Sequence, residues 1–476
     1  MGEEVEHNCL VVVAHNLHDA YAMASASDHR GKDSTGMFGC GENGIDVLKW
    51  RGSVTDFGNK ALQRIFPAEK YHTFGIHGRY RSKGDREINL DEAHPHVIGG
   101  IKEDRGNHVF IRGCQRALIH NGQIEERFFL GLDKSKLKTN CDSEALLHFY
   151  EQFGIENLIS SIVDGYTLAI ADVDSNGVAI SRGRCGLKPG VYGTKDGFDC
   201  FASESVALRE IHASLKGDII PGALYYLRPN GKMSEPKQVV TPRVKHCFFE
   251  YQYIAHPLSL IERLSVMAIR QDLGERLADE FHPKDAEFVT YNPESPKDAA
   301  QTYAAKIGVP LIECFYKING NRSFQAPTQK ARKADIDSNL HISPLAIPLI
   351  RGKTGIVVDD SLVRGTVTRR SRYLMYEVAH VKDVYFASYT PQIGIIGNDE
   401  IPRGCDIGGV DMPSKENKNN KFLARNRTSD EIDKFVGAKV YFLSTKGLRK
   451  VYEKRGMPFG NLCTYCIGGE HPFKQI

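Results

Sequence analysis

The strongest constraint on the fold is a stretch in the second half of the chain, where an apolar run leads into two adjacent acids and a small loop. It reads Ile356-Val357-Val358-Asp359-Asp360-Ser361-Leu362-Val363-Arg364-Gly365-Thr366. The run is typical of a buried strand, and in open α/β sheets ligands lie beyond the carboxyl ends of the strands. Loop N–H groups suit a monophosphate, and the two acids suit ribose hydroxyls or Mg²⁺. A junction with ordinary acidic N-capping would explain either acid alone, but not the whole pattern.

The surrounding pattern, from about Pro242 onward, predicts strands alternating with helices and therefore a parallel, doubly wound sheet. The helical spacing of Val266, Ile269, Leu273 and Leu277 predicts a helix over 259–281. Further helices are predicted over 297–307 and 367–380, and strands over 287–291, 310–314, 355–359 and 384–388. The basic segment 415–427 is expected to be exposed to solvent.

The first half of the chain has a different pattern, with many short strands between Gly- and Asp-rich turns. The predicted strands include 9–14, 166–173, 177–181 and 223–227, and the predicted helices are 17–27 and 142–153. This mixture favours an α+β layered domain. A length of 476 residues accommodates both halves as separate domains, which we predict over 9–242 and 243–476.

Composition excludes several classes of protein. Lys and Arg total 62 against 59 Asp and Glu, a formal charge of +3, which disfavours a dedicated nucleic-acid binder. No apolar run approaches the ~20 residues that span a bilayer, and the acidic start does not have the pattern of a secretory signal. We therefore expect a cytoplasmic protein with neither nucleic acid nor membrane as a partner.

Eleven cysteines, an odd and unevenly spread number, are a poor fit to a secreted disulfide framework. Most are expected to be small buried hydrophobic residues. Cys9 and the pair Cys463-x-x-Cys466 stand out by position. From spacing alone the pair is open to packing, a redox dithiol, a zinc site or an iron–sulfur site.

Four segments of the first half carry a family resemblance. They are His29-Arg30-Gly31-Lys32-Asp33-Ser34-Thr35-Gly36, His77-Gly78-Arg79-Tyr80, His120-Asn121-Gly122 and Asp142-Ser143-Glu144. In this order they resemble the motifs of class II, N-terminal-nucleophile glutamine amidotransferases. The resemblance implies a layered αββα glutaminase domain.

The same resemblance implies roles for individual residues. Cys9 would be the nucleophile once a propeptide, residues 1–8, is removed, and its freed α-amino group would carry the thiol proton. Asn121 and Gly122 would donate to the oxyanion. Glutamine would be bound by Arg30, Arg79 and Asp142, with Arg79 on the α-carboxylate and Asp142 on the α-ammonium.

The acid-pair stretch resembles the phosphoribosylpyrophosphate (PRPP) loop of type I phosphoribosyltransferases. By that resemblance Asp359 and Asp360 contact the ribose hydroxyls and Mg²⁺, with Ser295 on the Mg²⁺ side. The 5′-phosphate would be held by the loop residues Ser361, Val363, Arg364, Gly365 and Thr366. A loop carrying Lys317, Arg322 and Gln329 would close over PRPP.

A glutaminase half followed by a phosphoribosyltransferase half resembles the amidophosphoribosyltransferase family over nearly the whole chain. Membership implies a pentosyltransferase with glutamine amidotransferase activity, which converts PRPP, glutamine and water to 5-phosphoribosylamine, glutamate and pyrophosphate at the first step of purine (IMP) synthesis. It also implies purine nucleotides as feedback inhibitors and a homo-oligomer. Two departures stand in the sequence, Leu10 where the family usually has Gly, and Pro296 in the pyrophosphate-side segment.

One branch of the family carries a [4Fe–4S] cluster, and its ligand positions map onto Cys247, Cys405, Cys463 and Cys466. Two alternatives to the active enzyme remain open. One is a divergent, ammonia-dependent phosphoribosyltransferase, and the other is a non-catalytic regulatory paralogue. The retained acid pair and glutamine-site residues favour the active enzyme.

Overall fold

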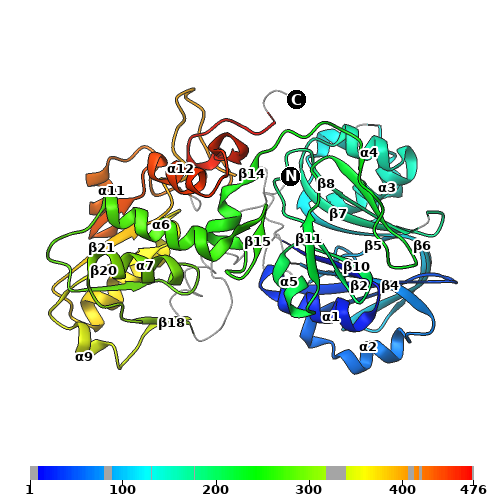
Figure 1. Ribbon diagram of the computed structural model, residues 1–476, viewed down its shortest axis with the longest axis horizontal. Coiled ribbons are helices and arrows are strands. Elements are labelled where there is room, and N and C mark those ends of the chain that lie inside the picture. The colour runs from blue at the N-terminus through cyan, green and yellow to red at the C-terminus, as the bar shows by residue number, and fades with distance from the viewer. Residues whose placement is uncertain are drawn as a thin grey trace.

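The computed structural model describes residues 9–79, 88–129, 131–175, 177–317, 339–405, 412–416 and 421–473. Figure 1 shows two bodies side by side, one built by the first half of the chain and the other by the second half. The domain boundary predicted at residues 242 and 243 falls between the strands β13 and β14. Within the described ranges no helix is long and apolar enough to cross a membrane.

The first half forms antiparallel strands in the order β11-β9-β10-β1-β4-β2-β3-β6-β7-β8-β12-β13, with β5 paired to β6. The strands are β1 (Leu10–Ala14), β2 (Ser34–Gly41), β3 (Gly44–Arg51), β4 (Tyr71–Arg79), β5 (His96–Asp104), β6 (His108–Gln123), β7 (Gly165–Asp172), β8 (Gly177–Arg182), β9 (Val191–Lys195), β10 (Phe198–Ala202), β11 (Ser214–Asp218), β12 (Ala223–Leu227) and β13 (Lys237–Gln238). The helices are α1 (Leu17–Ala26), α2 (Asn59–Ile65), α3 (Asp142–Phe153), α4 (Ile155–Ser161) and α5 (Ser205–Glu210).

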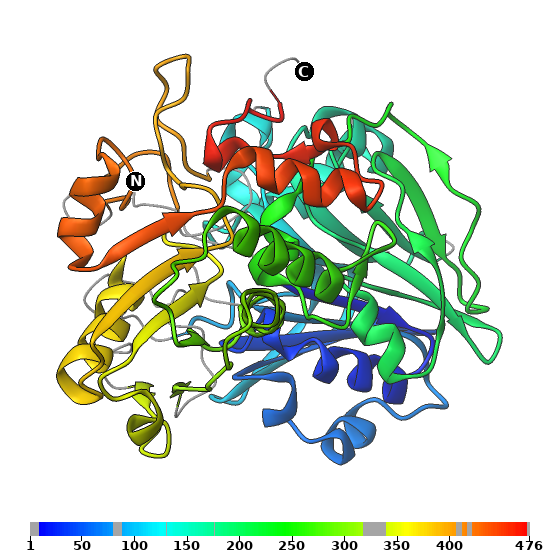
Figure 2. The same cartoon turned by 60° about the vertical axis from the view of Figure 1, so that its left-hand side comes forward.

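Alternation along the strands builds four layers from this sheet. In β1, Leu10 and Val12 pack with α1 and α5, whereas Val11 and Val13 pack against β6, β7 and β8. The other face of β7 and β8 packs with α3 and α4. Helices therefore cover both outer faces, as Figures 1 and 2 show, and the predicted αββα arrangement is confirmed.

The second half contains a parallel sheet in the order β17-β20-β21-β22. Its strands are β17 (Phe288–Tyr291), β20 (Thr354–Asp359), β21 (Asp383–Ser388) and β22 (Lys439–Phe442). The helices are α6 (Val266–Glu280), α7 (Lys297–Ile307), α9 (Ile347–Ile350), α10 (Thr366–Tyr373), α11 (Ser429–Val436) and α12 (Thr445–Lys454). Ile356 and Val358 face the core with α6, α7 and α12, whereas Val357 faces the opposite core, so the predicted doubly wound domain is confirmed.

Three short strand pairs complete the second half. They are the parallel pair β14 (His246–Cys247) with β23 (Leu462–Cys463), and the antiparallel pairs β15 (Leu260–Ile261) with β16 (Leu264–Ser265) and β18 (Phe315–Lys317) with β19 (Leu340–Ile342).

The helix predicted over 259–281 begins later, at Val266. Glu262 and Arg263 have φ values of 48° and 62°, which turn the chain between β15 and β16 and exclude a helix there. Ser265 then caps α6, since its side chain accepts from the Ala268 N–H at 3.3 Å. The hydrophobic spacing fits the helix but does not reveal the hairpin before it.

Two other segments also differ from their predictions. The expected strand over 310–314 is reduced to a single bridge between Leu311 and Val289. The helix predicted over 367–380 ends as α10 at Tyr373 and continues as the π-helical turn Leu374–Val378.

The prediction that 415–427 is exposed is wrong for residues 422–425, which are buried, whereas Lys415, Glu416, Lys421 and Asn426 are exposed as expected. Phe422, Leu423 and Ala424 are buried in the two cores of the second half or against them. Arg425 is only 8% exposed and donates from Nε to the Gly394 carbonyl at 2.6 Å. The basic composition of this segment therefore did not reveal that Arg425 and the apolar residues before it are buried.

Candidate active sites

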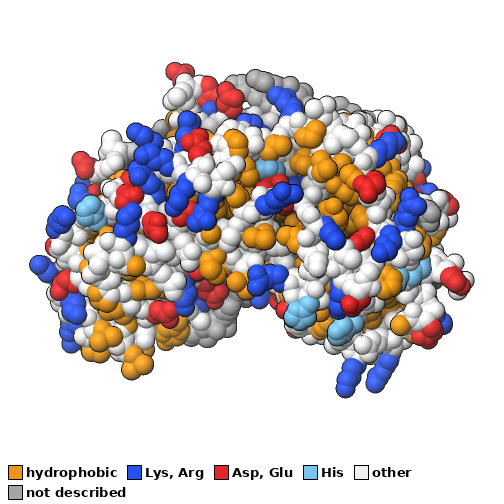
Figure 3. All heavy atoms as spheres, viewed as in Figure 1, with side chains coloured by type: hydrophobic (Ala, Val, Ile, Leu, Met, Phe, Trp, Pro, Cys, Tyr) orange, Lys and Arg blue, Asp and Glu red, His pale blue; other side chains and the backbone are white. Residues whose placement is uncertain are grey.

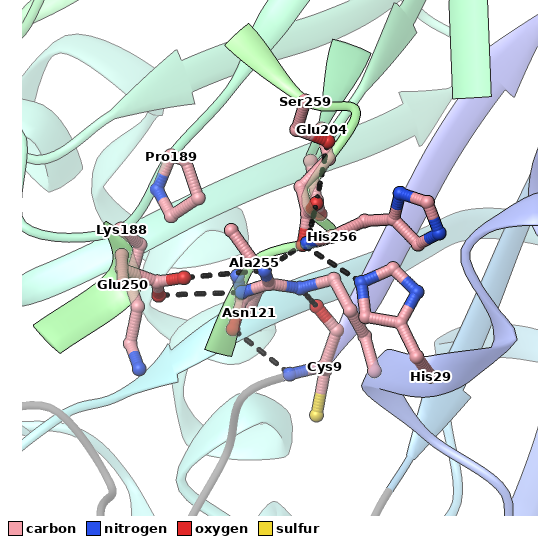
Figure 4. A network of polar contacts seen from close by, with 12 residues as sticks. Cys9, His29, Asn121, Lys188, Pro189, Glu204, Glu250, Ala255, His256 and Ser259 are labelled. Carbon is pink, nitrogen blue, oxygen red and sulfur yellow. Dashed lines mark hydrogen bonds and ion pairs between the residues drawn. The ribbon is translucent and has the colours of Figure 1, made fainter. Parts of the chain in front are cut away.

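The predicted nucleophile, Cys9, is fully buried immediately before β1 and lies against Asn121 of β6 (Figure 4). The Cys9 N–H donates to Asn121 Oδ1 at 3.0 Å. The Asn121 Nδ2 is buried and has no hydrogen-bond partner among the described residues. Because a buried donor without an acceptor costs free energy, this amide group is prepared for a ligand oxygen, as an oxyanion hole requires.

Gly122 follows with a backbone that only glycine can adopt. Its φ is +150°, and a Cβ added there would lie 2.3 Å from the Gly165 carbonyl oxygen. The close approach of β6 to β7 therefore explains why glycine follows Asn121.

Arg79 and Asp142 are brought to the same region by different elements. Leu10 pairs with Gly78, so Cys9 and Arg79 occupy adjacent positions at the ends of β1 and β4. Arg79 Nη1 donates to the Glu92 carbonyl, whereas its buried Nε has no partner among the described residues. Asp142 starts α3 and accepts from the Ile124 N–H at 2.7 Å.

The Cys141 thiol lies near both of these charged groups. Burial, followed by the Asp142 carboxylate, raises the pKa of Cys141 to about 11, and Arg79 partly opposes the rise. A guanidinium and a carboxylate therefore both lie near Cys141, and these are the two charges that bind an α-amino acid.

Arg30, which the sequence groups with the glutamine-binding residues, is buried between two acids. Its guanidinium donates from Nε to the Cys9 carbonyl at 3.3 Å and from Nη1 and Nη2 to carboxylates of Glu204 and Glu250. The role in glutamine binding stays a prediction. Sequence reasoning gave Glu204 and Glu250 no role, although an acid among apolar residues, as Glu250 is between Phe249 and Tyr251, is a signal of a buried ion pair.

The acid pair lies at the carboxyl end of β20, as predicted, and both carboxylates are almost completely buried. Asn292, at the end of β17, donates to Asp359 Oδ2 at 2.7 Å and accepts from the Ser371 hydroxyl at 2.6 Å. The Ser361 hydroxyl donates to Asp360 Oδ2 at 2.7 Å. Asn292 is a further site residue, to which sequence reasoning assigned no contact with the acid pair.

Burial dominates the electrostatics of the acid pair. It raises the pKa of Asp359 well above its usual value, with the neighbouring Asp360 adding to the rise, and it raises the pKa of Asp360 to about 6. Two acids that resist ionisation in the free protein become favourable ligands when a cation or hydroxyl groups arrive.

A pocket forms above the acid pair at the start of α10. It is lined by Asn292, Pro293, Lys317, the acid pair and the whole loop from Ser361 to Thr366. Gly365, with φ +72°, turns the loop into α10, so the loop and the helix N-terminus face the same pocket. The residues of the predicted phosphate-binding loop are thus brought together, whereas Arg322 and Gln329 lie outside the described residues.

A second cavity, of about 520 Å³, lies between the two domains. His29 and Lys32 of the first domain line it together with His256, Ser295 and Lys317 of the second. Lys317 also lines the pocket above the acid pair, so the cavity adjoins that pocket. Ser295, predicted on the Mg²⁺ side, faces the cavity.

The four cysteines predicted as cluster ligands come from distant parts of the chain. Cys247 pairs with Cys463 between β14 and β23. Burial raises the pKa of Cys466 well above its usual value, and the nearby Cys405, Cys247 and Cys463 thiols add to the rise. Among the described residues, no group of three or more His, Cys, Asp or Glu side chains is arranged to hold a single metal ion.

Zinc and an iron–sulfur cubane place different demands on four thiols. A zinc ion needs every sulfur at about 2.3 Å from one point. A cubane takes one thiolate at each of four iron atoms and therefore holds its sulfurs farther apart. Four neighbouring thiols, that of Cys466 buried and the other three half-buried, are the donor set that a cubane needs, and zinc accepts the same donors.

Comparison with known proteins agrees with both halves of the structure. The family model described as "Glutamine amidotransferase domain" matches residues 104–245. The amidophosphoribosyltransferase of Pseudomonas aeruginosa is 30% identical over 464 residues, which cover 90% of this chain and 85% of that protein. The amidophosphoribosyltransferase of Methanocaldococcus jannaschii is 29% identical, with 94% and 92% covered.

The fold agrees as well. The solved structure of glutamine PRPP amidotransferase from B. subtilis, complexed with ADP and GMP, matches with a TM-score of 0.78 at 22% identity, covering 98% of this chain and 97% of that one. On the sequence identity and coverage of its relatives, this chain belongs to the amidophosphoribosyltransferase family.

Proposed function

We propose that this chain releases ammonia from glutamine at Cys9 and uses it to convert PRPP to 5-phosphoribosylamine, the first step of purine synthesis. Amidophosphoribosyltransferases match this chain across both of its halves, and this observation carries the proposal. The chain is thus a transferase with a glutamine amidotransferase domain.

In the glutaminase half, the Cys9 thiolate would attack the glutamine amide, and the oxyanion would accept from Asn121 Nδ2 and Gly122 N–H. The buried Nε of Arg79, which has no partner in the part of the chain that the structure describes, supports its role on the α-carboxylate, and the position of Asp142 supports a role on the α-ammonium. After removal of residues 1–8, the α-amino group of Cys9 would take and return the thiol proton.

In the phosphoribosyltransferase half, the acid pair would hold the ribose hydroxyls and Mg²⁺, and the loop from Ser361 to Thr366 would hold the 5′-phosphate. The buried carboxylates and their Asn292 contact fit a divalent cation bound through oxygen ligands. When bound, Mg²⁺ would stabilise the charge that develops on the departing pyrophosphate.

The cavity between the domains supports internal transfer of ammonia. It is lined by His29, whose Nε2 lies 3.0 Å from Glu204 Oε1, and by Lys317, which also lines the phosphoribosyl pocket. Free ammonia is mostly protonated near neutral pH, so direct passage between the two sites would keep the nucleophilic form available.

A [4Fe–4S] cluster on Cys247, Cys405, Cys463 and Cys466 is part of the proposal. When bound, it would supply a covalent staple between the start of the second domain and the carboxyl-terminal tail. Purine nucleotides are proposed as inhibitors, because the similar B. subtilis structure is described with ADP and GMP. A homo-oligomer and a cytoplasmic location stay predictions.

The test is an activity assay that compares two nitrogen donors. Anaerobically purified protein is incubated with PRPP and Mg²⁺ and with either glutamine or ammonium, and pyrophosphate and glutamate are measured. We expect both nitrogen donors to support turnover. Turnover with ammonium alone would indicate a weakened glutaminase, and no turnover with either donor would favour a non-catalytic paralogue.

A further inference from the structure

A buried ion network surrounds the carbonyl side of the nucleophile. Arg30, only 1% exposed, donates from Nε to the Cys9 carbonyl at 3.3 Å. Its Nη1 and Nη2 reach Glu250 Oε2 and Oε1 at 3.2 and 3.3 Å, and Nη1 also contacts Glu204. Figure 4 shows Cys9, Glu204 and Glu250 close together in this network of polar contacts.

The network joins the two domains. Glu204 belongs to the glutaminase half, yet it accepts from the His256 N–H at 2.8 Å and from the Ser259 hydroxyl at 2.7 Å, both in the second half. Glu250, like His256 and Ser259, belongs to the second half, and it lies three residues after Cys247. The contacts of Arg30 therefore exist in full only when the second domain is docked.

The network is strongly charged and excluded from water. Burial would raise the pKa of Glu204, but His29 and Arg30 reverse the effect and hold that pKa well below its usual value. Burial opposes the charge on Arg30, but Glu250 and Glu204 raise its pKa above the usual value. Since an ion left unpaired in such a place is very unfavourable, the three side chains hold one another in a defined position.

Both backbone polar groups of Cys9 are thereby fixed. The N–H is held by Asn121 within the glutaminase half, and the carbonyl is held by Arg30, whose orientation depends on Glu250. We propose that Arg30 is a positioning residue which, through Glu250, makes the placement of Cys9 depend on docking of the second domain. This inference rests on the proposed function, and it gives Arg30 a role different from glutamine binding.

The test compares variants on the two sides of the domain interface. Arg30→Gln and Glu250→Gln are expected to lower kcat for glutamine-dependent turnover by at least about tenfold, because small displacements of a nucleophile have large kinetic effects. The KM for glutamine and the ammonium-dependent turnover should stay within about twofold. Arg30→Lys keeps the charge but not the fork of donors and should fall between Arg30→Gln and the unchanged protein.

The matched control is Glu262→Gln. Glu262, in the second half, forms an ion pair of 2.6 Å with Arg182 of the first half, and within the described ranges none of its hydrogen bonds or ion pairs reaches Arg30, Glu204 or Glu250. The substitution Glu262→Gln therefore breaks a comparable ion pair between the domains, and we expect it to leave kcat for glutamine-dependent turnover unchanged. An equal loss in Glu262→Gln would overturn the proposal, since docking alone would then explain the effect.

A second readout does not depend on turnover. The rate at which iodoacetamide alkylates Cys9, followed by mass spectrometry, should change in the same direction in Arg30→Gln and Glu250→Gln but not in Glu262→Gln. A raised KM with unchanged kcat in Arg30→Gln would overturn the inference, because Arg30 would then bind glutamine. If the unmodified protein uses no glutamine, the proposed function fails, and the alkylation rates still test the positioning role. If Arg30→Gln does not fold, Glu250→Gln and Arg30→Lys carry the comparison.

Discussion

At the scale of single residues, Asn121 combines two tasks that its two amide atoms divide. Oδ1 accepts from the Cys9 N–H and orients the nucleophile, whereas Nδ2 stays available to a ligand. The sequence predicts the donor role from a resemblance, but the acceptor role appears only in the structure.

Substitutions of Asn121 separate these tasks. Asn121→Asp keeps the acceptor and removes the donor, so we expect kcat for glutamine to fall by about 10²–10³, the usual effect of losing one oxyanion donor. Ammonium-dependent pyrophosphate release should be unchanged. The exposed Asn157→Asp serves as the control. Unchanged glutamine use in Asn121→Asp would contradict the assignment.

Burial makes the ionised form of Asp360 unfavourable in the free protein. Because its pKa is raised from 3.8 to about 6, the folded protein holds its proton more tightly than the unfolded chain. Stability should therefore fall as pH rises from about 4 to 6 and stay at the lower level above that range. Such a rise in pKa corresponds to at most ~3 kcal/mol.

Asp360→Asn removes this penalty. Above pH ~6 we expect a larger free energy of unfolding than in the unmodified protein, together with lost binding of PRPP and Mg²⁺. Below pH ~4 the two proteins should be equally stable, which provides an internal control. Chemical denaturation across this range, with calorimetry of PRPP binding, makes the measurement. Equal stability at neutral pH would show that Asp360 is not held against ionisation.

At the scale of elements, β14 and β23 form a two-residue parallel pair that ties the start of the second domain to the tail. It places Cys247 opposite Cys463. A pair this short has few hydrogen bonds of its own, so the stability of this junction depends on what links the side chains.

We therefore expect Cys463→Ser to lose iron and acid-labile sulfide and to become more sensitive to proteolysis in the tail. The matched control is Cys185→Ser, a buried thiol in the same small cluster of side chains that is not a predicted ligand. Metal analysis and limited proteolysis of both variants make the comparison. Full iron content in Cys463→Ser would refute the ligand assignment.

At the scale of the whole molecule, the two domains divide the reaction. Cys9 lies in the glutaminase half and the acid pair in the other half, and a shared cavity lies between them. Acidic and basic side chains are interspersed over the face of both domains in Figure 3.

Since the described residues that line the phosphoribosyl pocket all belong to the second half, Cys9→Ser should abolish glutamine use and keep ammonium-dependent turnover. Pyrophosphate release with each nitrogen donor measures the effect, and Cys200→Ser, a buried thiol of the same domain, is the control. Loss of both activities in Cys9→Ser would show that the two halves cannot work separately.

The local sequence pattern was sufficient to predict helices and strands whose formation depends on residues close together in the sequence. The helix over 297–307 and the strand over 223–227 are found as predicted, because their periodicity reflects packing on one face. Prediction failed where a distant contact or an unusual backbone decides, as at Glu262 and Arg263 before α6 and at the buried Arg425. Charge suggested exposure for Arg425, but carbonyl acceptors elsewhere in the chain satisfy its donors.

By itself the sequence determined the two fold classes and the acid pair with its loop, which are carried by residue type and short spacing, whereas Cys9 and the four cysteines were predicted only through a family resemblance. Only the tertiary structure decided that Arg30 lies between Glu204 and Glu250 beside the Cys9 carbonyl, and that one cavity adjoins both domains. The physical reason is that a buried ion network needs partners from segments more than 170 residues apart, as the separations of 174 and 220 residues show, and no local pattern records which distant carboxylate a guanidinium will meet.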